Sequence, residues 1–356
     1  MNDELNILKH EAVKLLKEII QIPSFSREEE NVVEVLSKYL QSKNILTEKI
    51  GNNLIAKNKY FDNSLQSIVL NSHTDTVHPN KSYTLNPFEP IERDGKIFGL
   101  GSNDAGGSLV SLLITFIYFY EKESLKFNLI FIASAEEEIS GKNGIELLLP
   151  QLNNLFCAIV GEPTGMQLAI AERGLLVLDC VSKGKPGHAA REEGINAIYN
   201  AINDINWIKN YQFPKISDLL GSVKLNVTVI DTLNKSHNII PDECRFVVDC
   251  RVNEFYTFNE IIETIQKNIN AKITPRSLRI CSTIISTEHP LVVAGKNLGR
   301  SVYGSPTSSD KSLMPCPTLK LGPGLSERSH TADEFIFKNE IFEGIELYIK
   351  IINQLL

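Results

Sequence analysis

The chain has 356 residues, enough for about two domains, because a single hydrophobic core seldom grows beyond roughly 250 residues. Its formal net charge of −7 comes from acidic and basic residues mixed along the sequence, without the basic block that tracks a phosphate backbone. The six cysteines are scattered and form no CxxC pair, as is typical of a reducing compartment. These properties argue against a nucleic-acid partner and predict a cytoplasmic protein.

The N-terminal segment and the longest apolar stretch both argue against a membrane partner. Residues 1–20 space their apolar side chains at helical intervals and carry acids early, which predicts an amphipathic helix and not a signal peptide. The apolar stretch LVSLLITFIYFY is shorter than the roughly 20 residues that a membrane-spanning helix needs. We therefore expect a soluble protein.

Helices and strands alternate through the first 160 or so residues. Ser26 and Glu29 have the spacing of a capping box at the start of a helix. The predicted elements are a helix over residues 30–40, a strand ending near His73, a helix over 106–120, a strand over 127–135, a helix over 143–149 and a strand over 156–162. This alternation predicts an α/β layer with a largely parallel sheet, in which functional residues gather at the carboxyl ends of the strands.

The pattern changes from about residue 172. The predicted elements are a strand from residue 175, a helix over 196–210, strands over 222–231 and 243–252, a helix over 258–269 and a strand over 277–285. This order is the ferredoxin-like split pattern. We expect an inserted α+β domain over residues 172–284, a discontinuous domain of residues 1–171 and 285–356, and a C-terminal helix within 332–356.

Side chains that bind metals follow the predicted strands. They are His73 and Asp75 in SHTDTV, Asp104 in GLGSNDAGGS, Glu136, Glu137 and Glu138 in ASAEEEISG, Glu162 in VGEPTG, and His330 in SERSHTADEF. Two imidazoles and three carboxylates from separate strand ends suit a pair of divalent cations. Two Zn²⁺ ions, three carboxylates and one hydroxide sum to neutrality, which leaves one glutamate over as a base.

Each of these residues also has a simpler explanation when it is taken alone. A triple glutamate is usually a solvated turn. His73 could be a hydrogen-bonded core histidine and Asp104 a helix cap. Glu162 could close a turn, and His330, just before a capping box expected from Thr331 to Glu334, could lie on the surface. GLGSNDAGG could suggest a nucleotide loop, but its spacing departs from GxGxxG.

The motifs together resemble the dinuclear zinc amidohydrolases that include acetylornithine deacetylase, succinyl-diaminopimelate desuccinylase, aminoacylases and glutamate carboxypeptidases. HTDTV, GLGSNDAGG, AEEE, VGEPT, GKPGHAA, NIIPDECRFVVDCR, TSSD and SHTADE occur in family order along nearly the whole chain. The short deacetylases of arginine biosynthesis and the related lysine-pathway hydrolases are the most similar. The resemblance implies a zinc-peptidase catalytic domain with an inserted lid domain that pairs two subunits.

The resemblance implies a metal-binding role for five residues. His73 and Glu162 are expected to bind one divalent ion, Glu138 and His330 the other, and Asp104 to bridge them. Zinc is the expected metal, with cobalt as the alternative.

Further roles also follow from the resemblance. Glu137 is expected to act as general base, while Asp75 accepts a hydrogen bond from the His73 ring. His188 in the lid domain would stabilise the oxyanion in the partner subunit's active site. The expected substrate contacts are Arg173, Asn238, Arg251, Thr307, Ser308 and Ser309, the last three of which are equally explained as turn residues.

Two features depart from the family pattern. A lysine often stands two residues after the bridging aspartate, where this chain has Gly106, so a positive charge near Asp104 is missing. The proline that commonly follows the lid histidine is also missing, which leaves the role of Arg191 open.

The expected activity is zinc-dependent removal of the Nα-acyl group from a small-molecule amino-acid intermediate, with N-acetylornithine first. N-acetylcitrulline, N-succinylcitrulline and N-succinyl-diaminopimelate are the alternatives, followed by a dipeptidase or carboxypeptidase activity. The alternative outside enzymes is a noncatalytic metal-binding partner subunit. The retained Glu137 argues against that alternative, because a protein that only holds metal needs no base.

Overall fold

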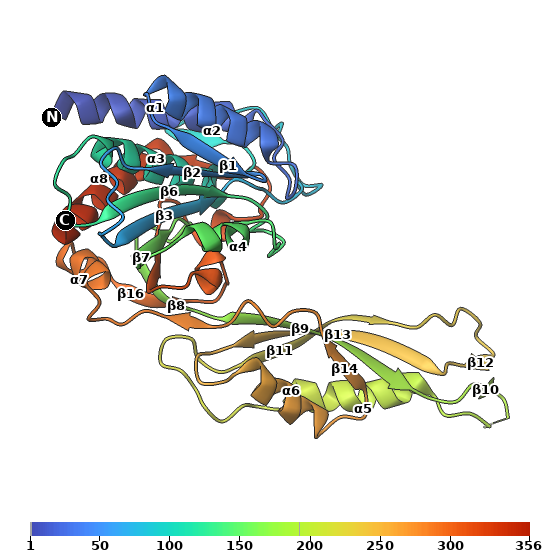
Figure 1. Ribbon diagram of the computed structural model, residues 1–356. Helices are drawn as coiled ribbons and strands as arrows, with labels where there is room; N and C mark the ends of the chain where they lie inside the picture. The colour runs from blue at the N-terminus through green and yellow to red at the C-terminus, as the bar shows by residue number, and fades with distance from the viewer. Residues whose placement is uncertain (1, 192) are drawn as a thin grey trace. The chain divides into compact units, whose positions relative to one another are not determined.

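The chain folds into two units, which the computed structural model describes for residues 2–191 and 193–356 (Figure 1). The first unit runs up to Ile170 and resumes over Ile285–Tyr303 and Ser309–Leu356. The second unit comprises Ala171–Ile284 and Gly304–Ser308. The expected lid segment, residues 172–284, lies in this second unit, which also takes in residues 304–308. No helix within the described residues is both long and apolar enough to cross a membrane.

The first unit is built on a mixed sheet whose centre is parallel. The central strands are β6 (Asn128–Ser134), β3 (Ser67–His73), β7 (Leu155–Val160) and β17 (Thr318–Lys320), in that order. Antiparallel strands flank them: β1 (Thr47–Ile50) and β2 (Asn53–Lys57) beyond β6, and β8 (Leu168–Glu172) beyond β17. Every residue of β3 and β6 is buried. The expected α/β fold with a largely parallel sheet is confirmed.

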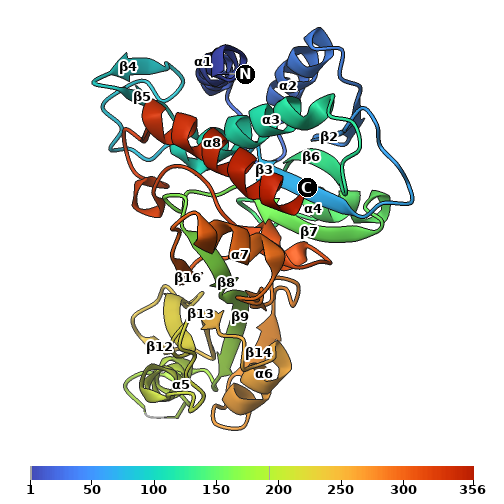
Figure 2. The same cartoon turned by 90° about the vertical axis from the view of Figure 1, so that its left-hand side faces the viewer.

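Helices cover both faces of this sheet (Figures 1 and 2). On one face α3 (Gly107–Tyr120) packs against β3 and β6, with α1 (Asn2–Ile20) and α8 (Lys338–Leu355) beside it. On the other face α4 (Ile145–Leu148) packs its buried residues against Val69, Ile130 and Ile132. The sheet and the helices α1 and α8 enclose α3, which explains why its sequence is apolar on nearly every side.

The remaining elements of the first unit lie around this core. They are α2 (Glu30–Ser42), which packs on β1 and β2; α7 (Pro290–Asn297), which packs on α8; the three-stranded sheet of β4 (Ile91–Arg93), β5 (Lys96–Phe98) and β18 (Phe335–Phe337); and β16 (Val302–Ser305), which pairs with β8.

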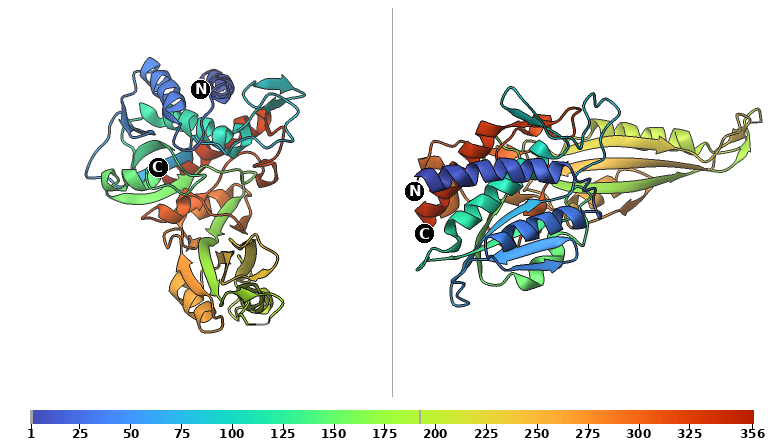
Figure 3. Two further views of the ribbon diagram at one scale, coloured as in Figure 1. Left: turned by 90° about the vertical axis from the view of Figure 1, so that its right-hand side faces the viewer. Right: turned by 90° about the horizontal axis from the view of Figure 1, so that it is seen from above.

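The second unit has the predicted ferredoxin-like order. Its elements are β9 (Gly174–Lys183), α5 (Ala197–Asn210), β11 (Lys224–Asp231), β13 (Glu243–Val252), α6 (Phe258–Gln266) and β14 (Lys272–Pro275). The strands form an antiparallel sheet in the order β11-β13-β9-β14, and both helices lie on one face (Figures 1 and 3). Two short pairs complete it: β10 (Gly187–His188) with β12 (Ile239–Ile240), and β15 (Thr283–Ile284) with β8.

The strand predicted over residues 277–285 is wrong. The fourth strand of the ferredoxin-like sheet is Lys272–Pro275, and of the predicted segment only Thr283–Ile284 is extended in a strand. Pro275 made the true strand hard to recognise, because proline cannot donate to a neighbouring strand and is tolerated only at an edge. The structure places β14 at the edge of the sheet.

The two expected capping boxes are also wrong. Ser26 donates to the Asp75 carboxylate (2.6 Å), and Glu29 accepts the N–H groups of Arg27 (2.7 Å) and Glu136 (3.0 Å) instead of capping α2. At the C-terminal end, residues 335–337 pair with β5, so the last helix begins only at Lys338.

Glu92 of β4 links two helices and gives the fold an acid-sensitive contact. It accepts hydrogen bonds from Lys17 of α1 and from Lys338 at the start of α8. These two bonds lower the pKa of Glu92 to about 2. Because the folded pKa lies below that of the unfolded chain, the contact stabilises fully above the unfolded pKa and is lost as the pH falls towards 2.

We expect Glu92→Gln to lower the free energy of unfolding by about 1 kcal/mol at pH 7, the scale of two partly exposed ion pairs. Urea unfolding of both proteins between pH 7 and pH 3 measures the difference, which should shrink with acid and also in 1 M salt. A difference that stays constant across this range would contradict the assignment.

Candidate metal centre

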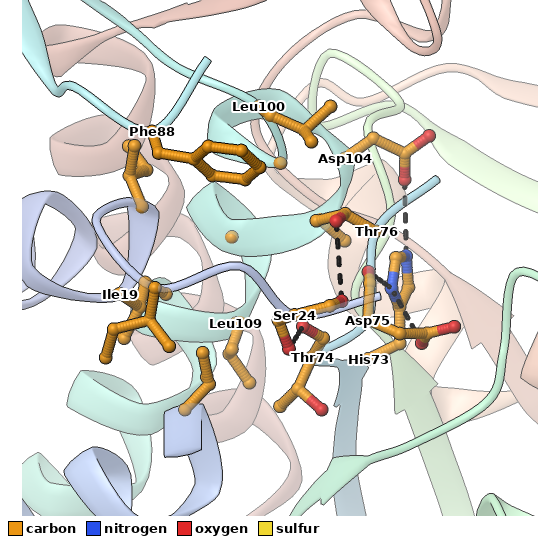
Figure 4. Close-up of a pocket in the computed structure, with 16 residues that line it drawn as sticks. Ile19, Ser24, His73, Thr74, Asp75, Thr76, Phe88, Leu100, Asp104 and Leu109 are labelled. Carbon is orange, nitrogen blue, oxygen red and sulfur yellow. Dashed lines mark hydrogen bonds and ion pairs between the residues drawn. The ribbon is translucent and has the colours of Figure 1, made fainter. Parts of the chain in front are cut away.

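His73 ends β3 at the carboxyl edge of the parallel sheet and is buried. Its Nδ1 lies 2.9 Å from the backbone carbonyl of Asp75 and 3.5 Å from the Asp75 carboxylate (Figure 4). A carbonyl oxygen can only accept, so Nδ1 carries a hydrogen, and in the neutral ring the lone pair is on Nε2. Nε2 faces Asp104 Oδ1 at 3.2 Å and Glu162 Oε1 at 3.7 Å.

Asp104 lies between the two histidines. It stands in the turn Ser102–Gly106 that precedes α3, and its Oδ1 faces His73. Its Oδ2 is 3.8 Å from Nε2 of His330, which in turn lies 3.1 Å from both carboxylate oxygens of Glu138. Glu162 follows β7 and reaches the His73 side of this arrangement. The structure therefore brings together all five residues expected to bind metal.

The three consecutive glutamates have different surroundings. The Glu136 carboxylate accepts from the Asn143 side chain (2.9 Å), away from the histidines. Ligand atoms of Glu137, His73 and Glu162 lie within 4.8 Å of one another, as do those of His73, Asp104 and Glu138. The turn after β6 therefore gives one glutamate to the protein scaffold and two to the candidate metal centre.

The Asp75 carboxylate holds this glutamate turn in place. Its Oδ1 accepts the backbone N–H of Glu137 (3.1 Å) and its Oδ2 that of Glu138 (3.1 Å). Asp75 also receives the Ser26 hydroxyl. It thus orients both His73 and the two glutamates, a wider role than the sequence predicted.

Two further acids at the centre were not expected from the sequence. The buried Glu334 carboxylate accepts three backbone N–H groups of the Asp104 turn, from Gly101 (2.9 Å), Asn103 (2.8 Å) and Asp104 (2.9 Å). Burial and the Asp104 charge raise the pKa of Glu334 to about 8. Asp310, in the TSSD motif, accepts from the side chains of Asn71 and Ser134. Burial raises its pKa to about 6. Asp310 ends the TSSD motif and Glu334 ends the SHTADE motif, but neither motif indicated a role for these acids at the centre.

The electrostatics of the centre fit a bound cation. Burial and the neighbouring carboxylates raise the pKa of Glu137 well above its usual range. Burial raises the pKa of Glu162 to about 8. For His73, burial alone would lower the pKa, but the carboxylates of Asp104 and Asp75 raise it well above its usual value. Glu162 Oε1 is buried and has no hydrogen-bond partner among the described residues. Divalent ions relieve this kind of repulsion, and imidazole with carboxylate is a donor set that suits them.

Apolar side chains line one side of the centre. Ile19, Phe88, Leu100 and Leu109 line a pocket together with His73, Asp75 and Asp104 (Figure 4). Such a wall keeps the local dielectric constant low, which strengthens every charge interaction at this edge of the sheet.

The expected lid histidine and its neighbour lie in the second unit. His188 is exposed on β10, and its Nδ1 accepts the backbone N–H of Ala190 (3.1 Å). The Asn238 carbonyl accepts the N–H of Ala189 (3.0 Å) in the same two-stranded ribbon.

The expected substrate contacts have partners of their own. Arg173 Nε donates to the Leu220 carbonyl (3.0 Å), and Arg251 pairs with Asp249 (2.8 Å). Burial and the nearby Arg251 charge lower the pKa of Arg173. The others take part in local turns: Thr307 N–H donates to Ser305, Ser308 donates to the Arg173 carbonyl, and Ser309, in the first unit, accepts the Lys311 N–H.

Comparisons with known proteins identify the family of the chain. The model of peptidase family M20/M25/M40 matches residues 69–354. An uncharacterised metallohydrolase of Methanocaldococcus jannaschii is 30% identical over 302 residues, covering 74% of this chain and 73% of the relative. The succinyl-diaminopimelate desuccinylase of Buchnera aphidicola is 29% identical over 282 residues, with 75% and 74% covered. The crystal structure of an aminopeptidase from Bacillus cereus shares the fold, with a TM-score of 0.79 at 19% identity and 98% of each chain covered. The expected family is thereby confirmed: the chain belongs to peptidase family M20/M25/M40 and is a metal-dependent amidohydrolase of that family.

Proposed function

We propose that this amidohydrolase removes the Nα-acyl group of an acylated amino acid, with N-acetylornithine as the first candidate substrate. The observation that carries the proposal is the place of Glu137, a half-buried carboxylate within 4.8 Å of ligand atoms of His73 and Glu162. A base beside candidate metal ligands is what hydrolysis of an unactivated amide requires. The desuccinylases among the relatives support an acylated amino acid as the substrate class.

The proposed metal centre holds two divalent ions, zinc in the first place and cobalt as the alternative. His73 and Glu162 would hold one ion and Glu138 and His330 the other, and Asp104, which lies between the two histidines, would contribute to both. When bound, such ions supply a Lewis acid for the amide carbonyl and lower the pKa of water. Asp75 keeps the hydrogen of His73 on Nδ1, so that Nε2 remains a donor to metal.

Glu137 is the proposed general base. Its carboxylate takes a proton from the attacking water as oxygen bonds to the amide carbon, and it gives that proton to the nitrogen as the C–N bond breaks. The Asp75 carboxylate fixes the base through its backbone N–H.

Substrate binding and oxyanion stabilisation are proposed for the second unit. Arg173 and Arg251, two neighbouring guanidinium groups, suit a substrate carboxylate. Asn238, Thr307 and Ser308 of this unit and Ser309 of the first unit are the further proposed contacts. Because Nδ1 of His188 accepts a hydrogen bond, its hydrogen is on Nε2, which can donate to an oxyanion.

We propose that His188 acts across a homodimer formed by the second unit. Strand β11 is an edge of its sheet and exposes Val229 (52%) and Ile230 (54%). An exposed apolar edge strand is suited to pairing with a second copy.

N-acetylcitrulline, N-succinylcitrulline and N-succinyl-diaminopimelate remain the alternative substrates. The desuccinylases among the relatives favour the last of these, and a dipeptide comes after them.

Replacing Glu137 by Gln should leave two zinc ions per chain and lower kcat by about a hundredfold to ten-thousandfold, the range for loss of a positioned base. Metal analysis and steady-state kinetics measure both quantities. Glu136→Gln is the matched control, since this neighbour faces Asn143, and it should keep activity within about tenfold of the wild type. Loss of zinc together with activity in Glu137→Gln would make this residue a ligand instead.

Hydrolysis by the zinc-loaded enzyme should favour N-acetylornithine over N-acetylcitrulline, N-succinylcitrulline, N-succinyl-diaminopimelate and a plain dipeptide. Values of kcat/KM for the panel decide the substrate, because specificity is the ratio of these constants. If the enzyme prefers a succinyl compound, the proposed acetyl group is wrong and the acyl group is succinyl. If it cleaves only the dipeptide, the proposed substrate class is wrong.

Subunit mixing tests the dimer. His188→Ala and Glu137→Gln should each be nearly inactive alone. An equal mixture of the two, unfolded and refolded together, should regain about a quarter of wild-type activity, because half of the dimers are then hybrids and each hybrid holds one complete site out of two. An active monomer in light scattering, or no recovery from a mixture that contains hybrids, would contradict action of His188 across subunits.

A further inference from the structure

Lys320 is a buried lysine beside the candidate metal centre. It is the last residue of β17, only 4% exposed, and pairs in register with Val160 of β7. Its Nζ lies 3.9 Å from Oε2 of Glu162, which follows Val160 by two residues. Burying an ammonium group is costly unless an anion lies nearby, so this placement calls for a reason.

The two oxygens of Glu162 face different partners. Oε2 faces the Lys320 ammonium, whereas Oε1 lies 3.7 Å from Nε2 of His73 and has no hydrogen-bond partner among the described residues. An ammonium group that attracts one oxygen of a carboxylate leaves the other oxygen facing the opposite side. Lys320 thus holds Glu162 with a single oxygen presented to the centre.

Gly106, in the turn that contains Asp104, cannot be replaced by a residue that would bring a positive charge to the centre. A Cβ added at Gly106 would lie 2.5 Å from the Gly101 carbonyl oxygen and 2.8 Å from Leu16 Cδ1, so no side chain fits there without a shift of backbone. The lysine missing after Asp104 therefore cannot simply be restored in this fold. Lys320, at the end of β17, places a positive charge beside the centre instead.

We infer that Lys320 is a positioning residue that orients Glu162 and thereby strengthens metal binding at the site formed by His73 and Glu162. The inference rests on the proposed metal centre. Two effects oppose each other, since an ammonium group repels a metal ion while it orders the ligand. Partners that orient a ligand typically change metal affinity by about 10- to 100-fold, and the inference states that ordering outweighs repulsion.

The test is stepwise zinc binding to the chelator-treated full chain, followed by competition with a chromophoric chelator. Lys320→Met should weaken one of the two zinc affinities by about tenfold or more and leave the other within about threefold. Lys320→Arg, which keeps the charge, should restore most of the loss. His330→Ala identifies the affected step, because it should remove the zinc affinity that Lys320→Met leaves unchanged.

Lys311→Met is the matched control for loss of a buried lysine. Lys311 is equally buried, but its Nζ donates to the Ile170 carbonyl (2.8 Å). Both zinc affinities should stay within about threefold of the wild type in this variant. Circular dichroism checks folding, and if Lys320→Met does not fold, Lys320→Gln and Lys320→Arg replace it, with weaker binding expected for Gln.

The outcomes separate the two proposals. If the wild-type chain binds no zinc, the proposed metal centre is wrong. A chain that binds two zinc ions with equal or higher affinity after loss of the Lys320 charge keeps the metal centre and overturns the inference. Equal weakening of both steps also overturns it, because that result describes a general structural role.

Discussion

Repulsion among buried carboxylates shapes the first unit around the candidate metal centre. The acids that support the centre are satisfied by backbone donors: Asp75 by the N–H groups of Glu137 and Glu138, and Glu334 by the Asp104 turn. Asp310 receives side chains from β3 and β6. The donors of the scaffold thus go to the supporting acids, while one oxygen of Glu162 has no hydrogen-bond partner in the part of the chain that the structure describes. Such an arrangement is stable only with positive charge between the remaining acids.

The parallel sheet explains how the charged residues meet. His73 ends β3, Glu162 follows the neighbouring strand β7, and the glutamate turn follows β6. Parallel neighbouring strands end at the same edge of a sheet, so the three motifs that follow β3, β6 and β7 become adjacent although they are far apart in the sequence. Asp104 and His330 are less constrained by the sheet, and Glu334 compensates by fixing the Asp104 turn through three backbone donors.

Sequence patterns predicted the strands and helices, which depend on neighbouring residues, and missed the hydrogen bonds between residues that are far apart in the sequence. The apolar run before His73 and the strand-helix alternation are local, and so the parallel sheet was predictable. Glu334 bonds to a turn 230 residues away in sequence, and no periodic signal reports such a contact. Periodicity also could not separate the surroundings of residues 136–138, because they lie in a turn, where the alternation of a strand gives no direction. Likewise Ser26 has a capping spacing but bonds to Asp75.

The position of β17 in the sheet has a consequence for synthesis on the ribosome. This strand lies between β7 and β8, yet it is translated only after the whole inserted segment, Ala171–Ile284. Nascent chains fold as units from the N-terminus. The second unit therefore has all of its main strands available while the central sheet of the first still has a gap. Lys320, His330 and Glu334 also follow the inserted segment, so the candidate metal centre is completed only after that segment has been made.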